Sequence, residues 1–321
     1  MSQNDSAVVT AAVGYVYVAA PGTPRPTPAA LAALDPEAFG AQSYTVSSSV
    51  AAPFTLAVGE ATVPDPVVPV VEPETADAVV PTSKTTKTST SSKAVAVEGK
   101  AIETTAELPA ESGAAEVQAA LEALPSVGAG NVKVTGETIS APGFTVAFIG
   151  KLHGQEVVLT ATGATATVAS APNGWATVGH TARDDLPEWG FDGGDTEVRG
   201  TWQNENLREV VTQPISDYLT IFLQQFDMQS FELYYGQDAA KQSGVFGVKG
   251  GTPAPVERAL LIIIVDGETK IAFYAPKASI KRDDSISLAT DEFASLPIRA
   301  TFLKYGSSNI FEWVNQDLFT P

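Results

Sequence analysis

Residues 258–276 read RALLIIIVDGETKIAFYAP, and this stretch decides the fold class. Two runs rich in β-branched and aromatic residues flank Asp266-Gly267, a pair that suits a type I′ turn, so the stretch predicts a β-hairpin. Residues 260–265 do not alternate between apolar and polar side chains. Such a run predicts a strand that is covered on both faces. We therefore expect a mainly β protein built around this hairpin.

More strands are expected on both sides of the hairpin, and most of them lie in the last 150 residues. A helix is expected at 228–235, because Phe231, Tyr234 and Tyr235 recur at helical spacing and Gly236 suits its end. All four tryptophans lie in this aromatic-rich part, at positions 175, 189, 202 and 313. The expected strands are 11–19, 175–179, 195–203, 217–226, 258–265, 269–275, 277–281, 285–289, 297–305 and 310–314.

The composition changes between residues 43 and 171, where Ala, Val, Thr and Ser dominate. A helix is expected at 112–124, with Ser112 as its N-cap and Pro125 as its stop. Short strands are expected at 53–60, 131–136, 143–150, 155–163 and 164–170. The segment therefore predicts a small α+β domain, inserted into a mainly β domain that consists of residues 1–42 and 172–321.

Residues 64–93 form a low-complexity stretch within this inserted segment. Five prolines are followed by a tract of Ser, Thr and Lys. Such a stretch cannot bury enough apolar area to offset its ordering entropy. We expect an extended, mobile loop there.

The overall composition argues against several classes of protein. The chain has no cysteine, so disulfides, thiolate metal sites and cysteine nucleophiles are excluded. Its two histidines, His153 and His180, lie far apart, which argues against the common zinc enzymes. The net charge is −18, without a basic stripe, which disfavours a protein that clamps nucleic acid. Residues 1–6 carry no basic side chain and no run of 18 apolar residues occurs, so we expect neither a secretory signal nor a membrane span.

Motifs that could carry chemistry are weak. The glycine-rich residues 244–251, GVFGVKGG, match neither phosphate-binding pattern and predict a mobile loop. Acidic clusters at 180–185, 191–197 and 283–284 sit where turns are expected. The tryptophans could stack on sugars, but packing in a core or between subunits is favoured. We assign no catalytic, cofactor-binding or metal-binding residue and expect no enzyme.

One long block carries a family resemblance. Residues 174–236 contain, in order, GHT, DDLPEWGFDGGDTE, GTWQN, LRE, QFD and FELYYG. This ordered pattern resembles the major tail tube proteins (major tail subunits) of siphophages that infect actinobacteria. Residues 11–28, AAVGYVYVAAPGTPRPTP, and 296–302, LPIRATF, resemble the same family. The middle segment is similar to a small domain that recurs in phage structural proteins, but departs from it in the 64–93 stretch.

The resemblance implies a β-sandwich-like tail tube domain with one flanking helix. It implies hexameric rings whose inner strands close into a β-barrel, and rings that stack into a conduit for genome delivery. The implied partners are further copies of the chain, the tape measure protein, and the tail terminator and distal tail proteins. Genomic DNA would pass through the lumen without tight binding, which the acidic charge allows. The implied location is the virion tail, after synthesis in the host cytoplasm.

Three other functions remain open from the sequence. A capsid or virion-surface decoration protein is the nearest, because the inserted domain resembles units found on several virion parts. A cell-surface-binding adhesin would use residues 43–171 as a wall-binding module, but the missing signal peptide argues against it. A carbohydrate-active enzyme would need paired acids and tryptophans in one site.

Overall fold

The computed structural model describes residues 8–60, 102–140, 142–240, 242–251, 254–288 and 290–319, so the predicted loop at 64–93 lies outside the described residues. The fold is mainly β, as predicted. The chain divides into two compact units. The larger one contains the residues up to Ser43, Ala147–Gln155 and the residues from Val168 onward, and the smaller one contains Tyr44–Val146 and Glu156–Thr167.

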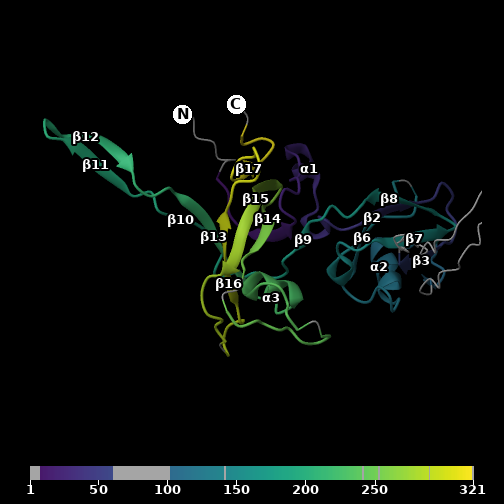
Figure 1. Cartoon of the computed structure of the whole chain (residues 1–321). Helices are drawn as coiled ribbons and strands as arrows, with labels where there is room; N and C mark the ends of the chain where they lie inside the picture. The colour runs from purple at the N-terminus through teal and green to yellow at the C-terminus, as the bar shows by residue number, and fades with distance from the viewer. Residues whose placement is uncertain are drawn as a thin grey trace, which may run out of the picture. The chain divides into compact units, whose positions relative to one another are not determined.

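Most of the elements are strands, and a few short helices lie between them in the sequence (Figure 1). In chain order they are β1 Val13–Ala19, α1 Pro28–Ala33, η2 Pro36–Ala38, β2 Ser43–Ser47, β3 Thr55–Glu60, β4 Glu103–Thr104, α2 Ala114–Glu122, β5 Val132–Thr135, β6 Phe144–Phe148, η3 Gly150–Leu152, β7 Val157–Thr162, β8 Thr165–Ser170, β9 Ala176–Thr177, β10 Glu188–Asp192, β11 Thr196–Thr201, β12 Asn204–Val211, β13 Ser216–Leu223, α3 Met228–Tyr235, β14 Val256–Asp266, β15 Thr269–Arg282, β16 Leu296–Phe302 and β17 Glu312–Val314.

An eight-stranded sheet organises the larger unit. Its order is β10-β13-β16-β15-β14-β1-β9, and β17 pairs with β15 beside this path. The predicted hairpin is confirmed as β14 and β15, in antiparallel register with Ile262 opposite Phe273. The turn lies one residue later than predicted. Asp266 pairs with Thr269, so the two-residue loop is Gly267-Glu268, and Gly267 takes the positive φ of 58° that the first loop position of such a turn requires.

Strand β14 is covered on both faces, as its unbroken apolar run predicted. Leu260 and Ile262 belong to one core cluster, which also contains residues of α3, β13 and β16. Leu261 and Ile263 belong to a second cluster with Trp175 and with Leu31 of α1. The sheet therefore separates two cores, and β14 contributes to each.

Helix α3 covers one face of this sheet and has the bounds that the sequence predicted, residues 228–235. The Asp227 side chain accepts a hydrogen bond from the Ser230 amide at 2.8 Å and caps the first turn. Gly236 follows with a φ of 90° and ends the helix. Leu233 and Tyr234 turn into the core.

Several strands differ from the prediction. Residues 269–275 and 277–281 form the single strand β15, because a bulge opposite Ala259 accommodates Pro276, which cannot donate to a ladder. Residues 285–289 were wrongly predicted as a strand: the described ones form only an isolated bridge from Ser287 to Ser295. Strands β2, β4, β10 and β12 were not predicted.

The smaller unit contains two small sheets and helix α2. The sheets have the orders β5-β6-β2-β8 and β4-β3-β7. Phe54 and Phe144, which are both fully buried, lie 6.4 Å apart between ring centroids in its core. The short strands predicted at 53–60, 131–136, 143–150, 155–163 and 164–170 are all present.

The predicted cap of α2 was wrong. The helix begins at Ala114, and its N-cap is Gly113, which has no side chain to bond the first turn. Ser112 is 2% exposed, and its hydroxyl lies buried without a hydrogen-bond partner among the described residues. The Ser112 amide donates instead to the Pro109 carbonyl at 3.1 Å, in a turn that places this side chain one residue too early for capping.

The chain enters and leaves the smaller unit along neighbouring strands. Strands β2 and β8 are adjacent in their sheet. Ser43 and Ser170, at their outer ends, bring their hydroxyl oxygens within 2.8 Å of each other. The places where the chain first enters and last leaves the smaller unit are therefore close together.

Candidate assembly surface

An exposed edge strand begins the candidate surface. Strand β10 ends the eight-stranded sheet and, among the described residues, pairs only with β13. It carries Trp189, which is 37% exposed, and Phe191, which is 65% exposed. The Trp189 ring lies 5.3 Å from that of Trp313 and 5.3 Å from that of Phe273, and these two contacts hold it against the sheet. An unpaired edge with large apolar side chains is a surface that another chain can cover.

Strands β11 and β12 form a separate two-stranded hairpin, called the arm here (residues 196–211). All its strand residues are exposed except the partly buried Val210. Val198, Leu207 and Val211 are more than half exposed, and Trp202 at the tip is 98% exposed. Figure 1 shows the arm projecting beyond β10, away from the rest of the sheet. An isolated two-stranded hairpin is at best marginally stable in water, so this arm needs a partner surface.

The arm continues the β10–β13 ladder through a short connection. The Gly194 amide donates to the Gln213 carbonyl, and the Thr212 and Gln213 amides donate to the Asp195 carbonyl. Gly193 has a φ of 83°, and a Cβ there would lie 2.4 Å from the Pro214 carbonyl oxygen. Glycine is therefore required at this position. The turn predicted within 191–197 was wrong: residues 193–195 join β10 to β11 within one continuing hairpin, and the chain reverses only between β11 and β12.

Arg299 on β16 holds the base of the arm. Its Nε donates to Asp283 Oδ1 at 2.7 Å and its Nη1 to Asp192 Oδ2 at 3.0 Å. Its guanidinium also lies 3.9 Å from the centre of the Tyr218 ring. The same tyrosine lies over Gly190, where a Cβ would meet the ring at 2.5 Å. Arg299 thus links β16 to the last residue of β10, where the chain leaves for the arm.

The charge of Arg299 is secured by these neighbours. Partial burial alone lowers the pKa of its guanidinium. The hydrogen bond and negative charge of Asp283, with smaller contributions from Tyr218 and Asp192, outweigh that effect, so the net pKa of Arg299 is raised. The ion pairs therefore persist across the pH range in which the carboxylates are charged.

A second exposed apolar region lies on residues 283–295, between β15 and β16. Leu288 is 79% exposed and Phe293 is 83% exposed. Asp283 and Asp284 begin this connection, as the predicted turn requires. Large apolar side chains at such exposure add to the surface available for association.

The histidine-containing residues 180–185 do not gather into a site. The His180 carbonyl accepts from the Gln224 amide, and the Ala182 amide donates to the Phe222 carbonyl, so this segment runs beside the end of β13. Asp184 and Asp185 are exposed in the connection to β10. Within the described part of the chain, no three His, Asp or Glu side chains form a group that could hold a metal ion.

The glycine-rich residues 244–251 form a loop without helix or strand. Phe246 packs against Phe231 of α3 at 5.4 Å between ring centroids, and the Gly247 amide donates to Asp238 Oδ1 at 2.8 Å. The amide of Gly247 is therefore used within the protein. The predicted mobility of this loop stays a prediction.

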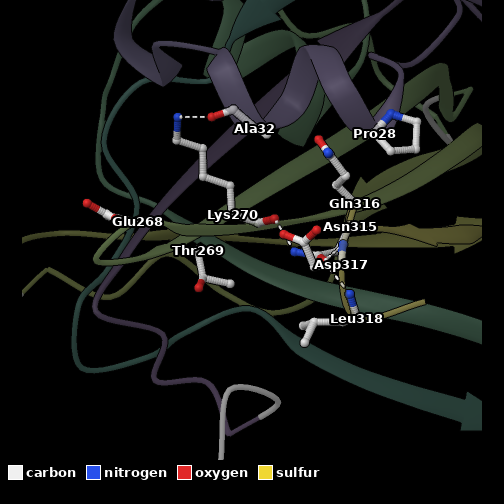
Figure 2. A pocket seen from close by; sticks show the side chains of 9 residues that line it. All are labelled: Pro28, Ala32, Glu268, Thr269, Lys270, Asn315, Gln316, Asp317 and Leu318. Atoms are coloured by element: carbon white, nitrogen blue, oxygen red, sulfur yellow. Dashed lines mark hydrogen bonds between the residues drawn. The ribbon is translucent and has the colours of Figure 1, made fainter. Parts of the chain in front are cut away.

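A polar hollow of about 300 Å³ lies beside α1 (Figure 2). Figure 2 shows Lys270 reaching the last turn of α1, where its Nζ donates to the carbonyls of Ala32 at 3.0 Å and Leu34 at 2.5 Å. Asn315 donates to the Lys270 carbonyl at 2.9 Å and accepts from the Asp317 and Leu318 amides. These bonds attach α1 and the C-terminal residues to β15. The Lys270 and Asn315 side chains at this hollow thus serve the fold.

The tryptophans divide between core and surface. Trp175 is 1% exposed and packs beside Phe39 and Tyr274, whereas Trp189, Trp202 and Trp313 are partly or fully exposed. No helix among the described residues is long and apolar enough to cross a membrane.

An antiparallel β fold with an exposed edge and a projecting apolar arm is suited to a subunit that associates with other protein chains. The sequence profile of the family described as phage tail tube protein matches residues 1–52 and 139–321, so the chain belongs to that family. It is similar to the major tail protein Gp23 of Mycobacterium phage L5 and to that of Mycobacterium phage D29. Each match is 49% identical over 146 residues, which are 46% of this chain and 73% of the relative. The recognition of an actinobacterial phage tail protein is thereby confirmed.

Sequence reasoning assigned no functional residues, so it missed the parts of this surface. The arm was predicted only as one strand at 195–203, and the Arg299 contacts were not predicted. One available signal for the hairpin was the pair of similar, largely polar segments on either side of Trp202, TEVRGT and NENLREVV.

Proposed function

We propose that this tail tube protein associates into hexameric rings, and that the rings stack into the tube through which the phage genome leaves the capsid. Family membership makes it a structural protein of the virion tail. That finding favours the tail tube over capsid decoration and over a cell-surface adhesin. The proposal adds the ring, the stack and their contacts.

The exposed arm is the observation that carries the proposal. A hairpin with three aliphatic side chains more than half exposed and a tryptophan 98% exposed is poorly suited to remain in water. Strand β10 also leaves one edge of the main sheet open within the described residues. Association of copies would cover both features, and closure of strands into a ring removes edges altogether.

Charge supports a conduit for DNA. The chain carries 37 acidic and 19 basic residues, a net charge of −18. A tube of such subunits repels polyanions, so DNA would slide through without tight binding. We propose no catalytic role. The family resemblance implies further partners: the tape measure protein inside the tube and the terminator and distal tail proteins at its ends.

Negative-stain microscopy of the purified chain tests this function. Open tubes of uniform bore, or hexameric rings at low concentration, are the expected result. Closed shells would support a capsid role, and monomers at all concentrations would contradict self-association. A variant in which a Gly-Gly turn replaces residues 196–211 should remain folded by circular dichroism but form no tubes.

A further inference from the structure

A second hollow, of about 230 Å³, lies near the base of the arm. Its floor is formed by β1 and β14, including Gly14 and Ile264, and its wall by Leu186, Pro187 and Trp189. A Cβ at Gly14 would have only the Ile263 carbonyl oxygen near it, at 3.9 Å, so the absence of a side chain leaves free space there. A cavity of roughly 150 Å³ already accommodates benzene, so this hollow has room for an indole ring.

One charged side chain lines this apolar hollow. Arg183 is exposed, and it has no ion pair or hydrogen bond among the described residues. An arginine beside an apolar wall is suited to contact an aromatic face and to pair with a carboxylate. The hollow therefore favours an occupant that brings an aromatic ring and a negative charge.

The tip of the arm provides both groups. Trp202 is the most exposed large apolar side chain among the described residues, at 98%. Glu205 follows it at the start of β12, is exposed, and has no ion partner in the described part of the chain. Tryptophan and arginine are the side chains that most often dominate binding energy at protein interfaces.

The occupant cannot be the arm of the same chain. Trp202 lies 13 residues after Trp189. At about 3.3 Å per residue the tip is on the order of 40 Å from the hollow along the ladder. The hydrogen bonds of Asp195 and Gly194 across the connection, together with the Asp192–Arg299 ion pair, keep the arm extended away from Trp189.

We propose that Trp202 of one copy occupies this hollow in another copy, with Glu205 facing Arg183. The inference rests on the proposed self-association and names one of its contacts. The inserted group and the hollow lie on different parts of one chain, so each copy can give its arm to one neighbour and receive the arm of another, which is a heterologous contact. Such contacts repeat from copy to copy and generate rings or open-ended stacks.

Chemical crosslinking tests the contact directly, because the natural chain has no cysteine. Gln203→Cys places a thiol beside Trp202, and Asp185→Cys places one beside the hollow, and neither side chain lines it. A short bismaleimide should link a mixture of the two single variants into dimers, whereas either variant alone should not crosslink. Glu197→Cys, at the base of the arm, is the matched control and should not react with Asp185→Cys. No crosslink in tubes that form normally overturns the contact and leaves the tube function intact.

Charge exchange gives a second, independent measurement. Arg183→Glu and Glu205→Arg should each raise the concentration needed for tube assembly by about tenfold, and the double variant should return to within about threefold of the natural chain. Light scattering against protein concentration measures this threshold. Additive effects of the two changes would show that the two side chains do not face each other. Loss of assembly in the natural chain itself would instead contradict the proposed function.

Discussion

At the scale of single residues, Arg299 shows how distant parts of the chain are joined. Its guanidinium contacts Asp192, Asp283 and Tyr218, which lie on or beside three other strands. None of these contacts has a local sequence pattern, because the partners lie 107, 16 and 81 positions away in the sequence. Such a cluster can be recognised only after the sheet order is known.

Replacing Arg299 tests its role in the fold. Arg299→Ala would leave Asp283, whose side chain is 23% exposed, without its cation, so we expect a loss of about 1–3 kcal/mol in the free energy of unfolding. Arg299→Lys should recover only part of this stability, since lysine lacks the planar, forked set of donors of the guanidinium group. Urea denaturation measures both. Arg199→Ala is the control: its pair with Glu197 is long, at 3.4 Å, and more than half exposed, so the change should be within about 0.5 kcal/mol. Equal losses at the two positions would contradict this role.

A pH effect is expected from Glu312. The hydrogen bond from Arg25, at 2.5 Å, holds the pKa of this carboxyl below its usual 4.5, although partial burial opposes the shift. The stabilisation is therefore present above pH 4.5 and is lost as the pH falls through the lowered folded-state pKa.

The matching variant is Glu312→Gln. It should cost about 1 kcal/mol of unfolding free energy at pH 7, and the difference from the natural chain should shrink toward about pH 3. Thermal unfolding in buffers between these two pH values measures this difference in stability. Glu292→Gln, on an exposed connection, serves as the control. A difference that grows in acid would contradict the assigned ion pair.

At the scale of elements, β14 is the strand on which both cores depend. Ile263 is 0% exposed, so Ile263→Asp would bury a carboxylate without a partner, at a cost of several kcal/mol. We expect loss of folded subunit, measured by circular dichroism and sedimentation. Val13→Asp on the neighbouring strand is the matched control, because Val13 is 48% exposed and should tolerate the charge. If the Ile263→Asp variant still formed tubes, that result would contradict the conclusion that both cores depend on β14.

The elements that the sequence predicted best are those with local signals. Helix α3 was predicted to its last residue, because its aromatic side chains recur at helical spacing and Gly236 marks its end. Strand β14 was predicted because its apolar run faces two cores. Strand β12, NENLREVV, was missed because it covers no core, so its sequence shows no alternation of buried apolar and exposed polar residues. The same reason explains why the candidate surface was predicted so poorly: its residues face outward, toward other chains.

At the scale of the whole molecule, the net charge of −18 predicts weak contact with DNA. A gel-shift measurement at low salt is the most demanding test, because attraction to phosphates is then strongest. We expect no shift of double-stranded DNA at micromolar protein. Binding in that range would contradict a lumen through which the genome slides, and would direct attention to a basic patch formed only on assembly.

The inserted segment is predicted to be dispensable for the tube. The boundaries 43–171 remain a prediction, but within that range the structure places Ala147–Gln155 in the larger unit. There the Phe148 amide donates to the Gln42 carbonyl, and the His153 ring lies 2.8 Å from the Phe39 carbonyl oxygen. Removing these residues leaves both carbonyls without their partners.

Two deletions separate these roles. One replaces residues 43–171 by a Gly/Ser linker, and the other removes 44–146 and 156–167 but keeps 147–155 between short linkers. Both should form tubes of normal bore, and the first should be less stable by about 1–2 kcal/mol. Microscopy and thermal unfolding measure the two effects. If neither folds, the segment belongs to the tube domain itself.

The closeness of Ser43 and Ser170 has a consequence for engineering. Their hydroxyl oxygens are 2.8 Å apart, so a foreign domain whose two ends lie near each other could be grafted between them with little strain. Every subunit offers this one graft position. A tail assembled from such fusions would present the cargo at regular intervals along its length, with a copy number set by the number of subunits.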